Sequence, residues 1–251
     1  MAAGEMSGKV VLLTGAGRGL GRATALRFAE VGAKLCLVDI QADGISETQK
    51  LIGHRAESHG FCADLADEKA CAAAVAAAVE RFGRLDALCN IAGIFLFAHS
   101  DRMPPEEWRR TLAVNLDAPF FLAQAAIPHL LKNNGAIVSV ASSAGLVAKP
   151  YAAAYCASKA GLIAMTKSLA MEYARKPIRI NAIAPGTMPS NAGSWAQLPE
   201  DIDQVLVERY NGFRDPIPSE DVADAIVMLA SERGRSYHGA CLAIDGGFTA
   251  G

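Results

Sequence analysis

The chain has 251 residues, of which 51% are hydrophobic and 20% are charged, and this composition is sufficient for a sizeable buried core. Its formal net charge of -2 gives no support for a nucleic-acid or anionic-membrane partner. The start, MAAGEMSGKV, lacks the apolar region of a signal peptide, and no apolar run reaches the ~18 residues of a membrane span. The cysteines are scattered and the histidines form no spaced set, so we expect reduced thiols, no metal site and a cytoplasmic protein.

Short β-rich runs alternate with helical patterns along almost the whole chain. Because parallel neighbours need a crossover that helices supply, this alternation predicts one doubly wound α/β domain of the Rossmann type over residues 1–251. Its seven-stranded parallel sheet would carry helices on both faces. The predicted strands lie within 9–15, 33–39, 60–64, 85–93, 135–142, 178–186 and 240–245, and the main predicted helices within 19–31, 67–82, 105–132 and 153–175.

The stretch TGAGRGLG, Thr14 to Gly21, follows the first predicted strand and opens the first helix. Its glycines fit the pattern T-G-x-x-x-G-x-G and not the pattern G-x-G-x-x-G. Glycines at this place allow backbone N–H groups to approach a pyrophosphate at the positive end of a helix. We therefore expect a dinucleotide to contact Gly15, Arg18, Gly19, Leu20 and Gly21.

Asp39 ends the second predicted strand and is followed by Ile40, a further predicted cofactor contact. A carboxylate at this position accepts hydrogen bonds from the adenosine ribose hydroxyls and repels a 2′-phosphate, which favours NAD over NADP. Arg18 is the contrary feature, because a basic residue in the glycine loop suits a 2′-phosphate. We expect Asp39 to decide the choice.

Beyond residues 187–203, which show little periodicity, no linker or repeat interrupts the chain. A loop of this length inside a compact domain is typically functional or disordered. We expect a substrate lid at about 187–215.

Four motifs occur in order along the chain: TGAGRGLG, NIAG from Asn90, VASS from Val140 and YCASK from Tyr155. Each motif alone is weak, but the ordered set closely resembles the short-chain dehydrogenase/reductase family. The resemblance runs from about Lys9 to Gly247 and includes IRINAIAPG and LAIDGG.

This resemblance implies a catalytic tetrad of Asn115, Ser142, Tyr155 and Lys159. Ser142 is preferred to Ser143 because it stands at the family's usual distance before the tyrosine. Ser190 occupies a position where the family often has threonine, so its predicted contact with the carboxamide is a departure from the pattern. The resemblance also places the following residues along the cofactor: Asp64, Leu65, Asn90, Ala92, Gly93, Tyr155, Lys159, Pro185, Gly186, Thr187, Met188 and Ser190.

The expected hydride transfer requires the same residue types, independently of the resemblance. Hydride transfer at a carbinol carbon requires a proton to leave or join the oxygen, and a free tyrosine with a pKa of about 10 is a poor base at neutral pH. Lys159, one helical turn after Tyr155, would favour the phenolate together with a positive nicotinamide. Ser142 would hold the substrate oxygen, and Asn115 would anchor a water for proton relay, distort its helix, or do both.

Apolar side chains predominate around the predicted substrate pocket, namely Phe95, Phe97, Val147, Tyr151, Met188 and Trp195. They predict a hydrophobic or ring-containing secondary alcohol or ketone as substrate. Lys149 is the nearest basic residue and would suit an acyl thioester if it faces the pocket. The resemblance further implies a homotetramer in which the helices within 105–132 and 153–175 pair.

The sequence therefore predicts an NAD(H)-dependent oxidoreductase that interconverts a secondary alcohol and a ketone, with Tyr155 as acid and base. One alternative is an NADPH-dependent 3-oxoacyl-thioester reductase, which Arg18 favours and Asp39 opposes. The other is a non-catalytic NAD-binding sensor or scaffold, against which the presence of Ser142, Tyr155 and Lys159 together argues.

Overall fold

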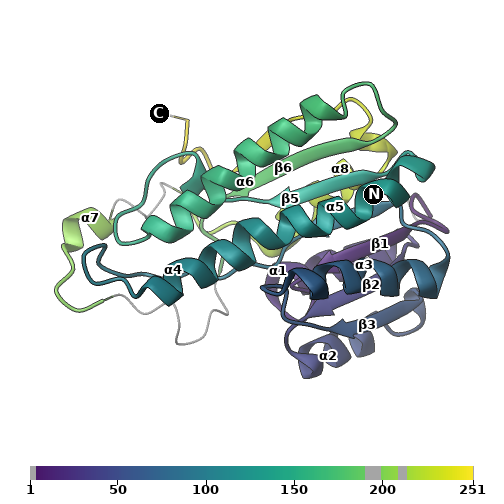
Figure 1. Ribbon diagram of the computed structural model, residues 1–251, viewed down its shortest axis with the longest axis horizontal. Helices are drawn as coiled ribbons and strands as arrows, with labels where there is room; N and C mark the ends of the chain where they lie inside the picture. The colour runs from purple at the N-terminus through teal and green to yellow at the C-terminus, as the bar shows by residue number, and fades with distance from the viewer. Residues whose placement is uncertain (1–3, 190–198, 209–213, 251) are drawn as a thin grey trace.

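The central strands of the protein are short apolar runs, buried on both faces as parallel strands require, whereas the two edge strands are only partly buried. The computed structural model describes residues 4–189, 199–208 and 214–250, and these form a seven-stranded sheet in the order β3-β2-β1-β4-β5-β6-β7 (Figure 1). Every neighbouring pair is parallel. The predicted doubly wound architecture is therefore confirmed. The strands are β1 (Val10–Thr14), β2 (Lys34–Asp39), β3 (Ser58–Cys62), β4 (Ala87–Asn90), β5 (Ala136–Val140), β6 (Arg179–Pro185) and β7 (Cys241–Ile244).

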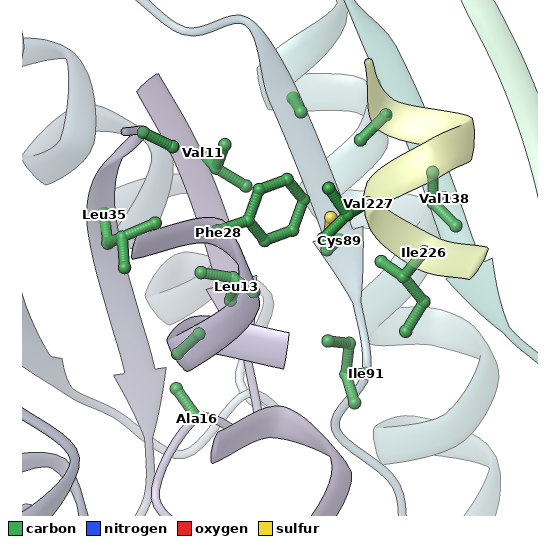
Figure 2. Close-up of a cluster of buried hydrophobic side chains, with 14 of the residues drawn as sticks. Val11, Leu13, Ala16, Phe28, Leu35, Cys89, Ile91, Val138, Ile226 and Val227 are labelled. Atoms are coloured by element: carbon green, nitrogen blue, oxygen red, sulfur yellow. The ribbon is translucent and has the colours of Figure 1, made fainter. Parts of the chain in front are cut away.

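Helices cover both faces of this sheet, and alternate strand residues supply a core to each face. On one face Val11 and Leu13 pack with Phe28 of α1 and Val227 of α8 (Figure 2), and α2 adds to this layer. On the other face the neighbouring side chains of β1 pack with α3, α5 and the end of α6. The helices are α1 (Gly19–Glu30), α2 (Ala42–Ile52), α3 (Glu68–Phe82), α4 (Pro105–Leu112), α5 (Ala118–Leu130), α6 (Ala153–Glu172), α7 (Gln204–Glu208) and α8 (Ser219–Ala230).

The helical segment predicted over 105–132 is present but is not a uniform α-helix. A π-helical turn over Ala113–Asp117 separates α4 from α5, and a 3₁₀ turn over Leu131–Asn133 follows α5. Pro119 has no N–H to donate to the carbonyl of Asn115 four residues earlier, so the α-helical ladder cannot continue at this point. The π turn places Asn115 in the interior of the protein.

Within the three described ranges, no helix has both the length and the apolar character needed to cross a bilayer.

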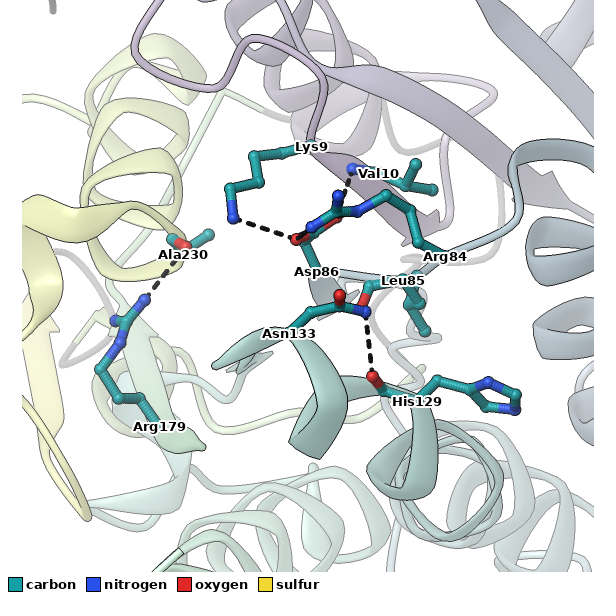
Figure 3. Close-up of polar contacts among 9 residues, drawn as sticks. All are labelled: Lys9, Val10, Arg84, Leu85, Asp86, His129, Asn133, Arg179 and Ala230. Atoms are coloured by element: carbon teal, nitrogen blue, oxygen red, sulfur yellow. Dashed lines mark hydrogen bonds and ion pairs between the residues drawn. The ribbon is translucent and has the colours of Figure 1, made fainter. Parts of the chain in front are cut away.

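A buried carboxylate fixes the amino end of β4 to its neighbours. Asp86, 5% exposed, accepts hydrogen bonds from the backbone N–H of Val10 at 2.9 Å and from the Arg84 guanidinium at 2.7 and 2.8 Å. Lys9 Nζ lies 3.2 Å from the same carboxylate (Figure 3). Burial opposes the charged form, but the hydrogen bonds from Arg84, Val10 and Lys9 outweigh it and hold the pKa of Asp86 below its usual range.

We expect Asp86→Asn to lower the free energy of unfolding by about 2–3 kcal/mol at pH 7, because it removes a buried anion from three donors. A depressed pKa in the folded state stabilises the protein above the unfolded value of about 3.9, and this contribution is lost as the pH falls through the folded value. The difference in the free energy of unfolding between variant and wild type should therefore become smaller at acidic pH.

Urea unfolding of both proteins between pH 7 and pH 3 measures this difference. Asp101→Asn is the matched control, since the Asp101 side chain is 80% exposed. Equal destabilisation by the two substitutions would contradict the assigned role of Asp86.

Candidate active site

Parallel strands end at one edge of their sheet, so the predicted site residues gather there although they are far apart in sequence. Asp39 ends β2, Asn90 ends β4 and Pro185 ends β6. The strand order reverses between β1 and β4, which is where open α/β sheets bind ligands. Around these ends lie the remaining predicted positions Gly15, Arg18, Gly19, Leu20, Gly21, Ile40, Asp64, Leu65, Ala92, Gly93, Ser142, Gly186, Thr187 and Met188. Ser190 and Trp195 lie outside the described residues.

The glycine loop is held against the loop that follows β4. Thr14 Oγ1 accepts hydrogen bonds at 3.0 Å from the backbone N–H groups of both Ile91 and Ala92. Gly15 has a φ of +68°, and a Cβ on it would lie 2.9 Å from the Ala92 Cα. Only glycine meets both conditions, and α1 then begins at Gly19 with its first N–H groups at the carboxyl edge. This arrangement suits a pyrophosphate.

Asp39 is held in place by two backbone donors. Its Oδ2 accepts from the N–H of Gly17 and its Oδ1 from the N–H of Gln41, each at 2.9 Å. The fixed carboxylate lies beside the exposed side chain of Ile40. Gly17 was not among the predicted contacts, because its bond to Asp39 joins residues 22 apart and leaves no local signal in the sequence.

Asp64 and Leu65, predicted near the adenine, have their side chains in other contacts. Asp64 Oδ2 accepts a hydrogen bond from Arg110 of α4 at 2.8 Å, and this bond lowers the pKa of the Asp64 carboxyl. The Leu65 side chain is buried in the hydrophobic cluster that includes Val38 and Cys71. The backbone of this segment still follows the end of β3 at the carboxyl edge.

Ser142, Tyr155 and Lys159 come together where β5 ends and α6 begins. Ser142 lies against Tyr155 and favours the ionised form of the phenol, which is the effect of a hydrogen bond from the serine. Lys159 Nζ lies 5.7 Å from the centre of the Tyr155 ring and donates to the carbonyl oxygen of Val140 at 2.7 Å. The neighbouring Ser143 has a buried hydroxyl with no hydrogen-bond partner among the described residues. The serine that meets Tyr155 is therefore Ser142.

Burial sets the protonation of both titratable groups in this trio. Desolvation raises the pKa of Tyr155, although the hydrogen bond from Ser142 opposes that shift. Lys159 is 3% exposed, and desolvation lowers its pKa to about 8. The sequence predicts a lowered pKa for Tyr155 from the nearby ammonium. In the protein alone the opposite direction holds, because partial burial of the phenol deprives the phenolate of hydration.

Asn115 is fully buried, and its side-chain amide bonds both the backbone N–H and the backbone C=O of one residue, Ile94, in the loop after β4. Oδ1 accepts from the N–H of Ile94 at 2.8 Å, and Nδ2 donates to the Ile94 carbonyl at 2.9 Å and to Ser158 Oγ at 3.1 Å. A Cβ on Gly93 would lie 3.3 Å from Asn115 Oδ1 and 3.4 Å from Lys159 Nζ. The amide therefore fixes this loop beside Lys159.

These residues together fit a dinucleotide cofactor. The N-terminus of α1 suits its phosphates, and the fixed Asp39 carboxylate suits the hydroxyls of a ribose. Asn90 Oδ1 is buried with no hydrogen-bond partner among the described residues, while its Nδ2 donates to Ser139 Oγ at 3.3 Å. An unused acceptor at the end of β4 is suited to a ligand donor.

Aromatic side chains stand beside Tyr155. The Phe95 ring meets the Tyr155 ring edge to face at 4.6 Å, and Phe97 meets Phe95 at 4.5 Å. Tyr151, predicted as a pocket residue, uses its hydroxyl to accept from the N–H of Asp203 at 2.9 Å, and its ring packs against His99. It adopts a φ of +60°, a strained value for an aromatic residue.

A cavity of about 210 Å³ opens next to Thr187. Phe248, which follows β7, lines it together with Arg214, and Lys149 Nζ lies 5.6 Å from the centre of the Phe248 ring. Burial lowers the pKa of Lys149. No sequence motif marks Phe248, which reaches the site only through the turn after β7. The full lining is Thr187, Arg214, Asp215, Pro216, Ile217, Asp245 and Phe248.

Known proteins resemble the chain over nearly its whole length. The family model described as enoyl-(acyl carrier protein) reductase matches residues 15–249. D-threitol dehydrogenase of Mycolicibacterium smegmatis is 37% identical over 98% of this chain and 94% of its own length. The 3-oxoacyl-[acyl-carrier-protein] reductase of Thermotoga maritima is 36% identical over 97% of this chain and 98% of its own. A short chain dehydrogenase from Mycobacterium paratuberculosis bound to NAD superposes with a TM-score of 0.91 at 27% identity, covering 99% of this chain and 100% of that one.

Because burial disfavours the ammonium, we expect Lys159 to lose its proton at about pH 8. A free lysine side chain has a pKa of about 10.4. Nuclear magnetic resonance of protein carrying ¹³Cε-labelled lysine should show one resonance with this low midpoint, absent from Lys159→Met. Lys149→Met is the matched control, since burial lowers the pKa of Lys149 as well. If the resonance lost in Lys159→Met titrates with the exposed lysines, the buried ammonium is misassigned.

Proposed function

The chain belongs to the short-chain dehydrogenase/reductase family of oxidoreductases, and from this premise we propose that it interconverts a secondary alcohol and a ketone with NAD(H). The observation that carries the proposal is the meeting of three side chains, namely Ser142 after β5, and Tyr155 and the buried Lys159 one helical turn apart on α6. A module that only binds a nucleotide has no need of these three groups together.

A bound nicotinamide would supply the hydride chemistry, and the protein supplies the proton and the orientation. In ketone reduction Tyr155 gives its proton to the substrate oxygen, and in alcohol oxidation it takes that proton. Ser142 donates a hydrogen bond to the same oxygen and keeps it within reach of the phenol. The raised pKa of Tyr155 keeps the phenol protonated in the absence of ligands.

Lys159 acts on the proton of Tyr155 in two ways. Its ammonium, 5.7 Å from the Tyr155 ring centre, favours a phenolate when one forms. Its pKa of about 8 lies near working pH, so it can also exchange a proton with a water. We infer that Asn115 supports this exchange by holding the loop of Gly93 and Ile94 beside Lys159.

NAD(H) is the proposed cofactor because Asp39 is an anion fixed by two backbone donors at the end of β2. A 2′-phosphate placed against it would meet like charge in a partly buried setting. The NAD-bound neighbour from Mycobacterium paratuberculosis supports this choice. Arg18, which opens α1 beside the loop, remains the contrary feature.

The proposed substrate is a small hydrophobic or ring-containing alcohol or ketone. Support comes from the aromatic wall of Phe95 and Phe97 against Tyr155. The relative named for D-threitol indicates that a substrate panel must also include small polyols.

An NADPH-dependent 3-oxoacyl-thioester reductase is the second candidate. Lys149 favours it, because this half-buried cation lies against Phe248, which lines the cavity next to Thr187. A basic group in that place suits the anionic arm of an acyl carrier. The relative from Thermotoga maritima supports the same reading.

We further propose that the chain is one domain with a substrate lid at about 187–215, and that it assembles as a homotetramer. Hydrogen bonds from the Asp203 N–H to the Tyr151 hydroxyl and from His99 Nε2 to the Glu200 carbonyl attach part of the proposed lid to the pocket loops. Exposed Phe120 of α5 and Met171 of α6 support helix pairing between subunits.

We expect Tyr155→Phe to reduce kcat/KM by ~10²–10⁴-fold with every active substrate, because it removes the proton donor and acceptor. The dissociation constant for NADH should change little. Steady-state kinetics on a panel of cyclic alcohols, small polyols and an acyl thioester, with calorimetry for NADH, measures both.

Tyr237→Phe is the control for this substitution, because Tyr237 precedes β7 at the opposite edge of the sheet. A wild-type protein that binds NADH but turns over nothing in the panel would favour the sensor reading. Retained activity in Tyr155→Phe would contradict the proposed mechanism.

We expect the wild type to bind NADH at least about tenfold more tightly than NADPH, and Asp39→Ala to narrow that ratio by removing the like charge. Calorimetry with both cofactors on both proteins measures it. Equal or tighter binding of NADPH by the wild type would move the thioester reductase to first place.

A further inference from the structure

A chain of polar contacts leads from the surface of α2 to the carboxylate of Asp39. Glu47 Oε2 lies 2.8 Å from Arg22 Nη2, and the same Nη2 donates to the carbonyl oxygen of Gly17. The N–H of Gly17 in turn donates to Asp39 Oδ2 at 2.9 Å. One amino acid of the glycine loop, Gly17, therefore connects Arg22 to the group proposed to choose the cofactor.

Two side chains of α2 fix the Arg22 guanidinium. Besides the ion pair with Glu47, Arg22 Nε donates to Thr48 Oγ1 at 3.1 Å. Thr48 is completely buried, and its hydroxyl lies 2.8 Å from the Ala16 carbonyl oxygen. The guanidinium and the hydroxyl thus bind the carbonyls of two successive residues of the glycine loop.

Gly17 is closely packed between Asp39 and α2. A Cβ on Gly17 would lie 2.9 Å from both Cγ and Oδ2 of Asp39, and a Cβ on Gly44 would lie 3.0 Å from the Cα of Gly17. Glycine has wide backbone freedom, so the peptides around Gly17 can rotate unless something holds them. Arg22 supplies that restraint at the Gly17 carbonyl.

We propose that Arg22 is a positioning residue for cofactor selection, which acts through Gly17 on Asp39. By fixing Gly17 it holds the Asp39 carboxylate where a ribose meets it and where a 2′-phosphate is repelled. The inference rests on the proposed NAD(H) function. The bonds to Glu47, Thr48 and Gly17 use Arg22 Nε and Nη2, so in this proposal Arg22 acts on cofactor choice through Gly17 and not by direct contact.

The test is a double-mutant cycle read out by cofactor binding. The dissociation constants of NADH and NADPH are measured by calorimetry for wild type, Arg22→Met, Asp39→Ala and the double variant. We expect Arg22→Met to reduce the preference for NADH by about three- to tenfold, a change of the size that one ordinary hydrogen bond contributes. In the Asp39→Ala background, the same substitution should leave the ratio unchanged.

Arg27→Met is the matched control, since Arg27 lies on the same helix and pairs with Glu30 and Asp224. It should leave both dissociation constants unchanged. Arg22→Lys keeps the charge but not the planar fork, so it should fold and show a smaller shift of the ratio in the same direction. Thermal unfolding of each variant separates loss of folding from loss of selection.

Three results would overturn the inference. An unchanged ratio in both Arg22 variants would remove the proposed role, and an equal shift in the Asp39→Ala background would show that Arg22 does not act through Asp39. A selective loss of NADPH binding would show that Arg22 holds the 2′-phosphate itself. In each case a wild-type preference for NADH leaves the proposed function standing, whereas a wild type that prefers NADPH contradicts both.

Discussion

The site depends on one hydroxyl, that of Thr14, at the point where β1 and β4 diverge. Its oxygen accepts the N–H groups of both Ile91 and Ala92, which fixes the loop after β4 to the end of β1. The glycine loop leaves the sheet at this point, and Gly15 lies directly against Ala92. Because the two loops share this anchor, the proposed phosphate-binding and proton-transfer sides of the site hold a constant spacing.

Burial of Lys159 on the proposed proton-transfer side removes hydration from its ammonium group. An ammonium that is 3% exposed loses most of its hydration, and the Val140 carbonyl at 2.7 Å replaces only part of it. Asn115 supports this arrangement indirectly. Its amide bonds both the N–H and the C=O of Ile94, which keeps the loop of Gly93 close to the ammonium. Burial lowers the pKa of Lys159 and raises the pKa of Tyr155. As the pH rises, the ammonium therefore loses its proton before the phenol does.

The strands and the glycine loop could be predicted because their signals are local: apolar runs and glycine spacing reflect backbone conformation within a few residues. Tyr155 and Lys159 were readable for the same reason, as they lie one helical turn apart. A distortion of the helix at Asn115 was among the expectations, and the π turn bears it out. The raised pKa of Tyr155 was not expected, since it depends on tertiary burial. Gly17 was also missed, because its partner Asp39 is distant in sequence and adjacent only after β1 and β2 pair.

The two halves of the site are built from different kinds of contact. On the cofactor side, backbone groups make the decisive bonds, as at Thr14 and Asp39, and these positions tolerate little change of shape. On the substrate side, loop side chains such as Phe95 and Tyr151 make ring contacts and one hydrogen bond. Loops on a rigid scaffold can change without disturbing the sheet. A family built in this way can keep its hydride chemistry while its members differ in the alcohol that they accept.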